Sequence, residues 1–235
     1  MKKLLLLSLM SLLSVTPAMS ATEKVIGATV GDFAELSRES LKPLLEKKGY
    51  KVRVVEFTDY VQPNIALSEG SLDLNIFQHK PYLEQFAKEK GLSLTPIAQV
   101  PTAPLGIYPG KLKQLSEVKN GSTVAMPNDP TNLARALLIL ADLKWIELPQ
   151  KFDPFKIAPK DIVKNPKNIK IVQLEAAQIP RATQDVDFPI INGNYVVSSG
   201  MSLTSKLMAE KSDAYINWAV VRSKEVESDF AKAVK

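Results

Sequence analysis

The chain has 235 residues, with 30 Lys and Arg against 25 Asp and Glu, a single His and no Cys. This length suits one large domain or two small lobes, and a hydrophobic fraction of 45% is that of a globular chain with a real core. Without Cys there is no disulfide and no Cys-ligated metal, and one His excludes multi-histidine metal sites. We therefore expect neither a metal nor a cofactor.

Residues 1–20 have the pattern of a secretory signal peptide. Lys2 and Lys3 precede an apolar stretch over 4–15, and small residues over 17–21 place the expected cleavage between Ser20 and Ala21. The apolar stretch is too short to cross about 30 Å of hydrocarbon comfortably, which argues against a membrane anchor. Removing Lys2 and Lys3 lowers the net charge from +5 to +3. That surplus is too small to indicate nucleic-acid binding.

The first half of the mature chain alternates expected strands and helices. Strands are predicted over 25–30, 51–57 and 72–77, and helices over 34–48, 61–69 and from Pro81 to Gly91, because hydrophobic residues repeat at the matching periods and Gly or Pro stands at the ends. This order implies a parallel sheet with helices on its faces.

The second half repeats the scheme. Strands are predicted over 122–126, 169–174 and 188–192, and helices over 133–145 and 176–185. Two extended apolar runs, 101–108 and 214–222, are interpreted as crossovers between two α/β lobes. The expected domains are thus lobe 1 (21–101 plus 214–235) and lobe 2 (102–213), with a cleft between them.

Motifs of catalysis are nearly missing from the sequence. No G-x-G-x-x-G follows the first expected strand, and an S-x-x-K match at 116–119 has neither of its companion motifs. The carboxylate pairs lie in stretches that otherwise look like solvated faces. We therefore expect a protein that is not an enzyme.

Four polar clusters follow expected strands, where parallel sheets bind ligands. They are residues 58–64 with Tyr60, residues 77–82 with Phe77, His79 and Tyr82, residues 127–135 with Arg135, and residues 191–195 with Asn192, to which Asn217 is added. Asp129 is an expected helix N-cap and Pro130 an expected first helical residue. The aromatic side chains can line an apolar slot, and Arg135 can pair with a carboxylate. Each cluster taken alone also fits a structural role, as core aromatics or turn-forming asparagines.

Together these residues resemble the MetQ-type methionine-binding proteins of the NlpA family, the substrate-binding components of methionine ABC importers. The resemblance runs from about residue 25 to residue 222. It rests on the stretches F-T-D-Y-V-Q-P-N (57–64), F-Q-H-K-P-Y-L (77–83), P-N-D-P-T-N (127–132) with Arg135, N-P-K-N (165–168), L-E-A-A-Q (174–178), P-R (180–181) and I-N-G-N-Y (191–195).

The resemblance implies a periplasmic-binding-protein fold, with two Rossmann-like α/β lobes closing on a free amino acid. Arg135 would hold the α-carboxylate, and Asn192, favoured over Asn194, would bind the amino-acid backbone together with Asn217. The residues implied around the ligand side chain are Tyr60, Phe77, His79 and Tyr82. A slot of aromatic rings suits a thioether.

Two departures from the family pattern bear on location and stability. Most members carry a lipid-modified Cys at the signal cleavage site, and this chain has none. We therefore expect a protein without a lipid anchor, free and monomeric in a Gram-negative periplasm. Most members also continue after the last crossover strand, whereas the chain ends at Lys235, so weaker stability or importer docking is expected.

Three functions remain open at this point. The leading one is methionine capture for import. The second is the same fold with another ligand, namely a different amino acid, D-methionine or a short peptide. The third is a non-transport surface or adhesion protein.

Overall fold

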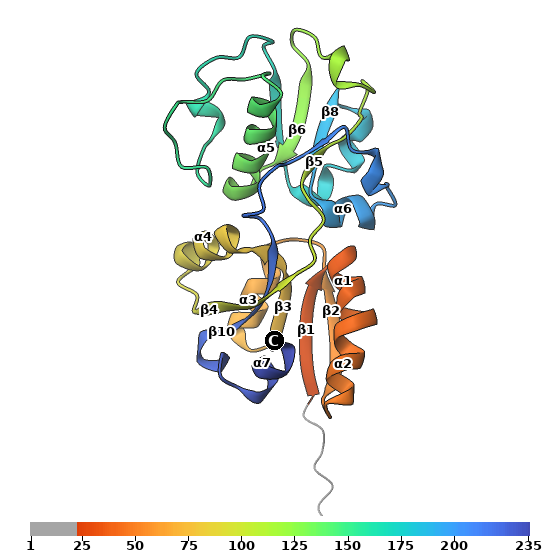
Figure 1. The fold of residues 1–235 in the computed structure, drawn as a ribbon, viewed down its shortest axis with the longest axis vertical. Helices are drawn as coiled ribbons and strands as arrows, with labels where there is room; N and C mark the ends of the chain where they lie inside the picture. Colours follow the sequence, from red (N-terminus) through yellow and green to blue (C-terminus); the bar gives the residue numbers. More distant parts are fainter. Residues whose placement is uncertain (1–22) are drawn as a thin grey trace, which may run out of the picture.

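The computed structural model describes residues 23–235. The expected signal peptide lies outside these residues. Two lobes, each built around a five-stranded sheet, follow one another along the long axis of the molecule (Figure 1). The chain passes between them twice, once after β4 and once before β10 (Figure 1). The expected two-lobed α/β fold is confirmed.

The first lobe contains the sheet with strand order β2-β1-β3-β10-β4. Its strands are β1 (Glu23–Thr29), β2 (Lys51–Phe57), β3 (Leu74–His79), β4 (Leu94–Val100) and β10 (Asn217–Arg222). Its helices are α1 (Asp32–Leu36), α2 (Lys42–Lys47), α3 (Gln62–Glu69), α4 (Lys80–Lys90) and α7 (Asp229–Val234). A π-helical segment over Ser37–Leu41 joins α1 to α2, so that the helix expected over 34–48 is continuous.

The second lobe contains the sheet with strand order β7-β6-β8-β5-β9. Its strands are β5 (Gly106–Ile107), β6 (Thr123–Pro127), β7 (Lys170–Leu174), β8 (Phe188–Ile191) and β9 (Met208–Ala209). Its helices are α5 (Pro130–Asp142) and α6 (Gly193–Ser198). The expected caps of α5 are confirmed, because the Asp129 side chain accepts from the Asn132 backbone N–H at 3.0 Å and Pro130 opens the helix.

Two sequence expectations are wrong. The sheets are mixed, since β10 runs antiparallel to β3 and β4, and β5 runs antiparallel to β8 and β9. The chain enters these positions from the other lobe, in the direction opposite to the βαβ strands. The helix expected over 176–185 is instead two short 3₁₀ turns, Ala176–Gln178 and Arg181–Gln184. Pro180 lies between them, and its ring and missing N–H prevent a continuous α-helix.

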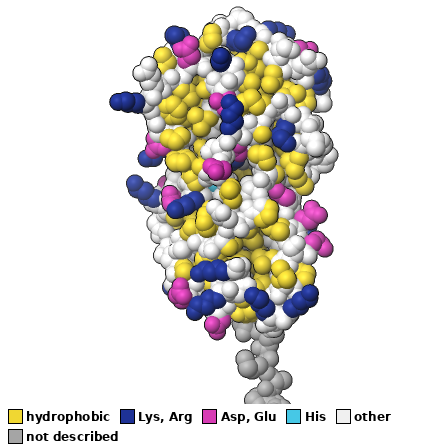
Figure 2. Space-filling model, viewed as in Figure 1, with side chains coloured by type: hydrophobic (Ala, Val, Ile, Leu, Met, Phe, Trp, Pro, Cys, Tyr) yellow, Lys and Arg dark blue, Asp and Glu magenta, His cyan; other side chains and the backbone are white. Residues whose placement is uncertain are grey.

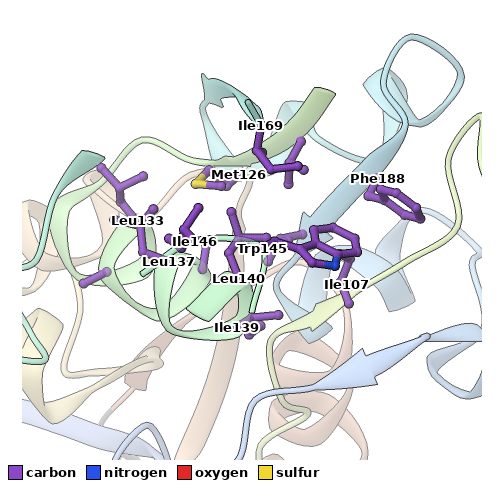
Figure 3. Close-up of a cluster of buried hydrophobic side chains, with 14 of the residues drawn as sticks. Ile107, Met126, Leu133, Leu137, Ile139, Leu140, Trp145, Ile146, Ile169 and Phe188 are labelled. Carbon is purple, nitrogen blue, oxygen red and sulfur yellow. The ribbon is translucent and has the colours of Figure 1, made fainter. Parts of the chain in front are cut away.

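Each lobe has its own hydrophobic core. In the second lobe Leu133, Leu137 and Leu140 project from one side of α5 toward Met126 and Trp145 (Figure 3). In the first lobe Ile26 and Ile76 from the sheet pack with Phe230 from α7. Burial of such side chains stabilises a fold by about 1.5–3 kcal/mol each. These cores make each lobe a rigid support for the residues at its strand ends.

The surface of the described chain carries mixed charge. On the face drawn in Figure 2, cationic and anionic side chains are interspersed and do not gather into a patch of one sign. Within residues 23–235, no helix is both long enough and apolar enough to cross a membrane.

Candidate functional site

All seven residues predicted for the site line one cavity between the lobes. They are Tyr60, Phe77, His79, Tyr82, Arg135, Asn192 and Asn217. Six of them lie in or after β2, β3, β6 and β8, whose carboxyl ends meet at the boundary between the lobes, which is why residues distant in sequence come together there. The space open to the centres of water molecules is about 20 Å³, which is room for about one water. A ligand of amino-acid size therefore requires the lobes to separate or side chains to move.

Aromatic rings form the first-lobe side of the cavity. The Tyr60 ring centre lies 5.9 Å from that of Phe77 and 6.1 Å from that of Tyr82, and the Phe77 and Tyr82 centres lie 5.9 Å apart. The Tyr82 hydroxyl donates to the Tyr60 carbonyl at 2.7 Å, which fixes the loop after β2 against α4. Burial raises the pKa of Tyr60 well above its usual range, so its hydroxyl stays neutral.

His79 is held as a neutral imidazole at the junction of β3 and α4. Its Nδ1 accepts the Tyr82 backbone N–H at 3.1 Å and caps α4, so the ring proton of the neutral form is on Nε2. Nε2 lies 3.5 Å from the Asn132 Oδ1. Burial, and then the nearby Arg135 charge, lower the pKa of His79 well below its usual value. The imidazole therefore acts as an uncharged donor beside the aromatic rings.

This buried imidazole predicts an acid-sensitive fold. The unfolded chain protonates His79 near pH 6.5 whereas the folded chain does not, so the free energy of unfolding should fall by up to about 1.4 kcal/mol per pH unit as the pH drops below 6.5. Urea unfolding between pH 5.5 and 7 measures this slope. His79→Asn retains an acceptor for the α4 cap and should lose the slope. Equal slopes in both proteins would contradict the assignment.

Arg135 is buried on α5 and is already paired inside the protein. Its Nε donates to the Glu210 Oε2 at 2.8 Å, and its Nη2 donates to the Glu210 Oε1. Its Nη1 donates to the Asn132 Oδ1 at 2.6 Å, and the Tyr215 ring centre lies 4.5 Å from Cζ. These bonds use three of the five guanidinium N–H groups. The remaining two are available to a ligand carboxylate.

Asn132 orients the polar side of the cavity. Its Oδ1 faces donors on Arg135, Asn192 and His79, while its Nδ2 donates to the Asp129 carboxylate at 2.9 and 3.0 Å. Because Asp129 can only accept from this amide, the Asn132 oxygen is forced toward the cavity. Asn132 lies in the conspicuous stretch 127–135 but was not among the predicted site residues, because its three partners become apparent only in the fold.

Asn192 presents an unused acceptor. Its Nδ2 donates to the Asn132 Oδ1 at 3.0 Å, but its buried Oδ1 has no hydrogen-bond partner among residues 23–235. Such an atom costs about 1–3 kcal/mol until a donor reaches it. Asn194, by contrast, uses both amide atoms across the lobes, accepting from the Tyr60 hydroxyl at 2.6 Å and donating to the Val30 carbonyl at 3.3 Å. Asn217 opens β10 and is buried at the cavity wall.

A family model for the NlpA lipoproteins matches residues 25–235. The chain belongs to the NlpA lipoprotein family. The probable D-methionine-binding lipoprotein MetQ of Pasteurella multocida is 38% identical over 91% of this chain and 79% of its own length.

Two solved structures of similar proteins share the fold. A nutrient binding protein from Burkholderia cenocepacia bound to methionine has a TM-score of 0.86 at 37% identity, over 90% of this chain and 89% of the other. An ABC transporter periplasmic substrate-binding protein from Coxiella burnetii has a TM-score of 0.83 at 36% identity, with the same two coverages. The expectation of a binding protein rather than an enzyme is confirmed by this family.

Proposed function

We propose that this protein is a periplasmic substrate-binding protein that captures free methionine and delivers it to an ABC importer. The observation that carries the proposal is one buried cavity with a guanidinium, an unpartnered amide oxygen and several aromatic rings. Relatives over most of the chain, one named a probable D-methionine-binding lipoprotein and one solved with methionine, support the same ligand class.

Different residues of the cavity bind the charged part and the apolar part of the ligand. Arg135 binds the α-carboxylate with its two remaining N–H groups, and the ammonium donates to the Asn192 Oδ1, beside Asn217. The thioether lies among Tyr60, Phe77, Tyr82 and His79, where each contact between sulfur and a ring contributes about 0.3–1.5 kcal/mol. The carboxylate, the ammonium and the thioether of methionine each have a chemically matched partner in the cavity.

Closure of the lobes couples binding to transport. Lobe 1 (21–101 plus 214–235) and lobe 2 (102–213) move about the two crossovers, and the ligand favours the closed form by contacting both. The contacts from Tyr60 to Asn194 and from the Tyr195 hydroxyl to the Thr58 carbonyl, 3.0 Å, hold that form together. The importer permease then recognises the closed protein.

The location belongs to the same proposal. Relatives are named as lipoproteins, whereas the 235-residue sequence offers no Cys for a thioether-linked lipid. We infer a protein exported by cleavage after Ser20, free of lipid and monomeric in the periplasm.

One mass-spectrometry experiment tests ligand and processing together. The protein is purified from the periplasm under native conditions, its intact mass is measured, and it is then denatured to release bound small molecules. We expect methionine in the released fraction and a chain that starts at Ala21 without lipid. Release of another amino acid would assign the site to that ligand. An added diacylglyceryl mass would contradict the inference that the protein carries no lipid.

Thermal unfolding separates the alternatives. Added L-methionine should raise the melting temperature, and methionine sulfoxide should raise it much less, because its polar oxygen enters the aromatic slot. D-Methionine and short peptides are compared at the same concentrations. A larger shift with either would favour that ligand, and no shift with any of them would favour a surface or adhesion role.

A further inference from the structure

Glu210 is the partner that Arg135 has inside the protein. It directly follows β9 on the chain's return toward the first lobe, and its side chain is only 8% exposed. Its carboxylate accepts from Nε and Nη2 of Arg135 and from the Leu105 backbone N–H at 2.8 Å. Glu210 itself does not line the cavity. It contacts the guanidinium from the side away from the cavity, close enough for its charge to act on a ligand bound at Arg135.

The charge balance of the cavity follows from this pair. Among the described residues that line the cavity, Arg135 carries the only formal charge at neutral pH, because His79 is neutral there. The negative charge of Glu210 neutralises the positive charge of Arg135. A ligand carboxylate at Arg135 is therefore the second anion on one buried guanidinium, and a ligand without a cation leaves the site with a net negative charge. In a poorly solvated site such an imbalance is costly.

A zwitterion avoids this imbalance. Its ammonium restores neutrality, and the unpartnered Oδ1 of Asn192 is a buried acceptor for it. A second buried carboxylate, Asp129, is bonded to Asn132 and interacts electrostatically with Arg135, which further disfavours an anion. The groups around the cavity thus favour a ligand that carries both charges.

We propose that Glu210 is a specificity-determining residue that makes the cavity select net-neutral amino acids over the corresponding anionic acids. This inference rests on the proposed methionine site and defines its substrate class. Glu210 acts through Arg135 and through its own charge, without touching the ligand.

The first arm of the test uses the unaltered protein. Calorimetry compares L-methionine with its α-hydroxy analogue, an anion that keeps the thioether, the carboxylate and a donor for Asn192. We expect the zwitterion to bind about 100-fold or more tightly, given the strength of charge interactions near a buried pair. Equal affinities would overturn the inference without any variant. Binding of neither compound would overturn the proposed function as well.

The second arm removes the charge of Glu210. Glu210→Gln keeps an acceptor for Leu105 and should lower the affinity ratio of methionine to the hydroxy analogue by about 10-fold, because the anion loses a repulsion while the two zwitterion charges respond in opposite directions. Glu210→Asp should retain most of the ratio. Glu147→Gln is the matched control, since Glu147 is exposed and pairs with Lys164 in the same lobe. A folded Glu210→Gln protein with the unaltered ratio would show that Glu210 is merely structural.

Discussion

Arg135→Ala is expected to weaken methionine binding by about 3 kcal/mol or more, a loss of over about 100-fold in affinity. The guanidinium is 4% exposed, so a ligand carboxylate left beside the alanine would be buried without a counter-charge. Isothermal titration calorimetry measures the loss. Near-unchanged affinity would remove Arg135 from the site.

The same substitution should also destabilise the ligand-free protein. Without Arg135 the Glu210 carboxylate keeps only the Leu105 N–H among its bonds in the described chain. Breaking a buried ion pair from one side costs about 3–5 kcal/mol, which urea unfolding can measure.

The double variant Arg135→Ala with Glu210→Gln distinguishes the two effects. It removes the unpaired charge, so most of the stability should return while binding stays lost. If binding returned together with stability, the loss in Arg135→Ala would have been an effect of folding alone.

The parts of the site that could be predicted share one physical origin. Tyr60, Phe77 and His79 follow or end β2 and β3, while Arg135 and Asn192 follow β6 and β8. Local hydrophobic periodicity locates those strand ends, and the carboxyl ends of neighbouring parallel strands lie together. Polar and aromatic residues at such ends were therefore expected to converge, and the structure brings them to one cavity.

Glu210 could not be predicted in this way. It follows a two-residue strand, it lies 75 positions from Arg135, and the charged residues around it have no periodic pattern. Its pairing depends on the return path of the chain between the lobes, which local sequence does not specify. The helix expected over 176–185 was wrong for a local reason. The composition of this segment favours a helix, but the single Pro180 prevents one.

Gly31 is the second position where one side chain should have a large effect, in this case on closure. It lies between β1 and α1 with φ +97°, and a Cβ built there would stand 2.1 Å from the Asn194 carbonyl oxygen in the second lobe. That oxygen belongs to the backbone of α6 and cannot rotate away. Gly31→Ala therefore has to push the lobes apart, which also breaks the bonds from Asn194 to Tyr60 and Val30.

We expect Gly31→Ala to lower methionine affinity by about 100-fold, because two or three cross-lobe hydrogen bonds at about 1 kcal/mol each no longer support the closed form. Gly49→Ala is the control, since Gly49 has φ +88° in the same lobe but no atom within 4 Å of a Cβ. It should lose stability from backbone strain and keep its affinity. Calorimetry gives the affinities, and small-angle scattering should show a larger radius of gyration for Gly31→Ala with methionine present. If both variants bound methionine like the unaltered protein, the close approach of Gly31 to Asn194 would be unnecessary for binding, and the other cross-lobe contacts would be enough to support the closed form.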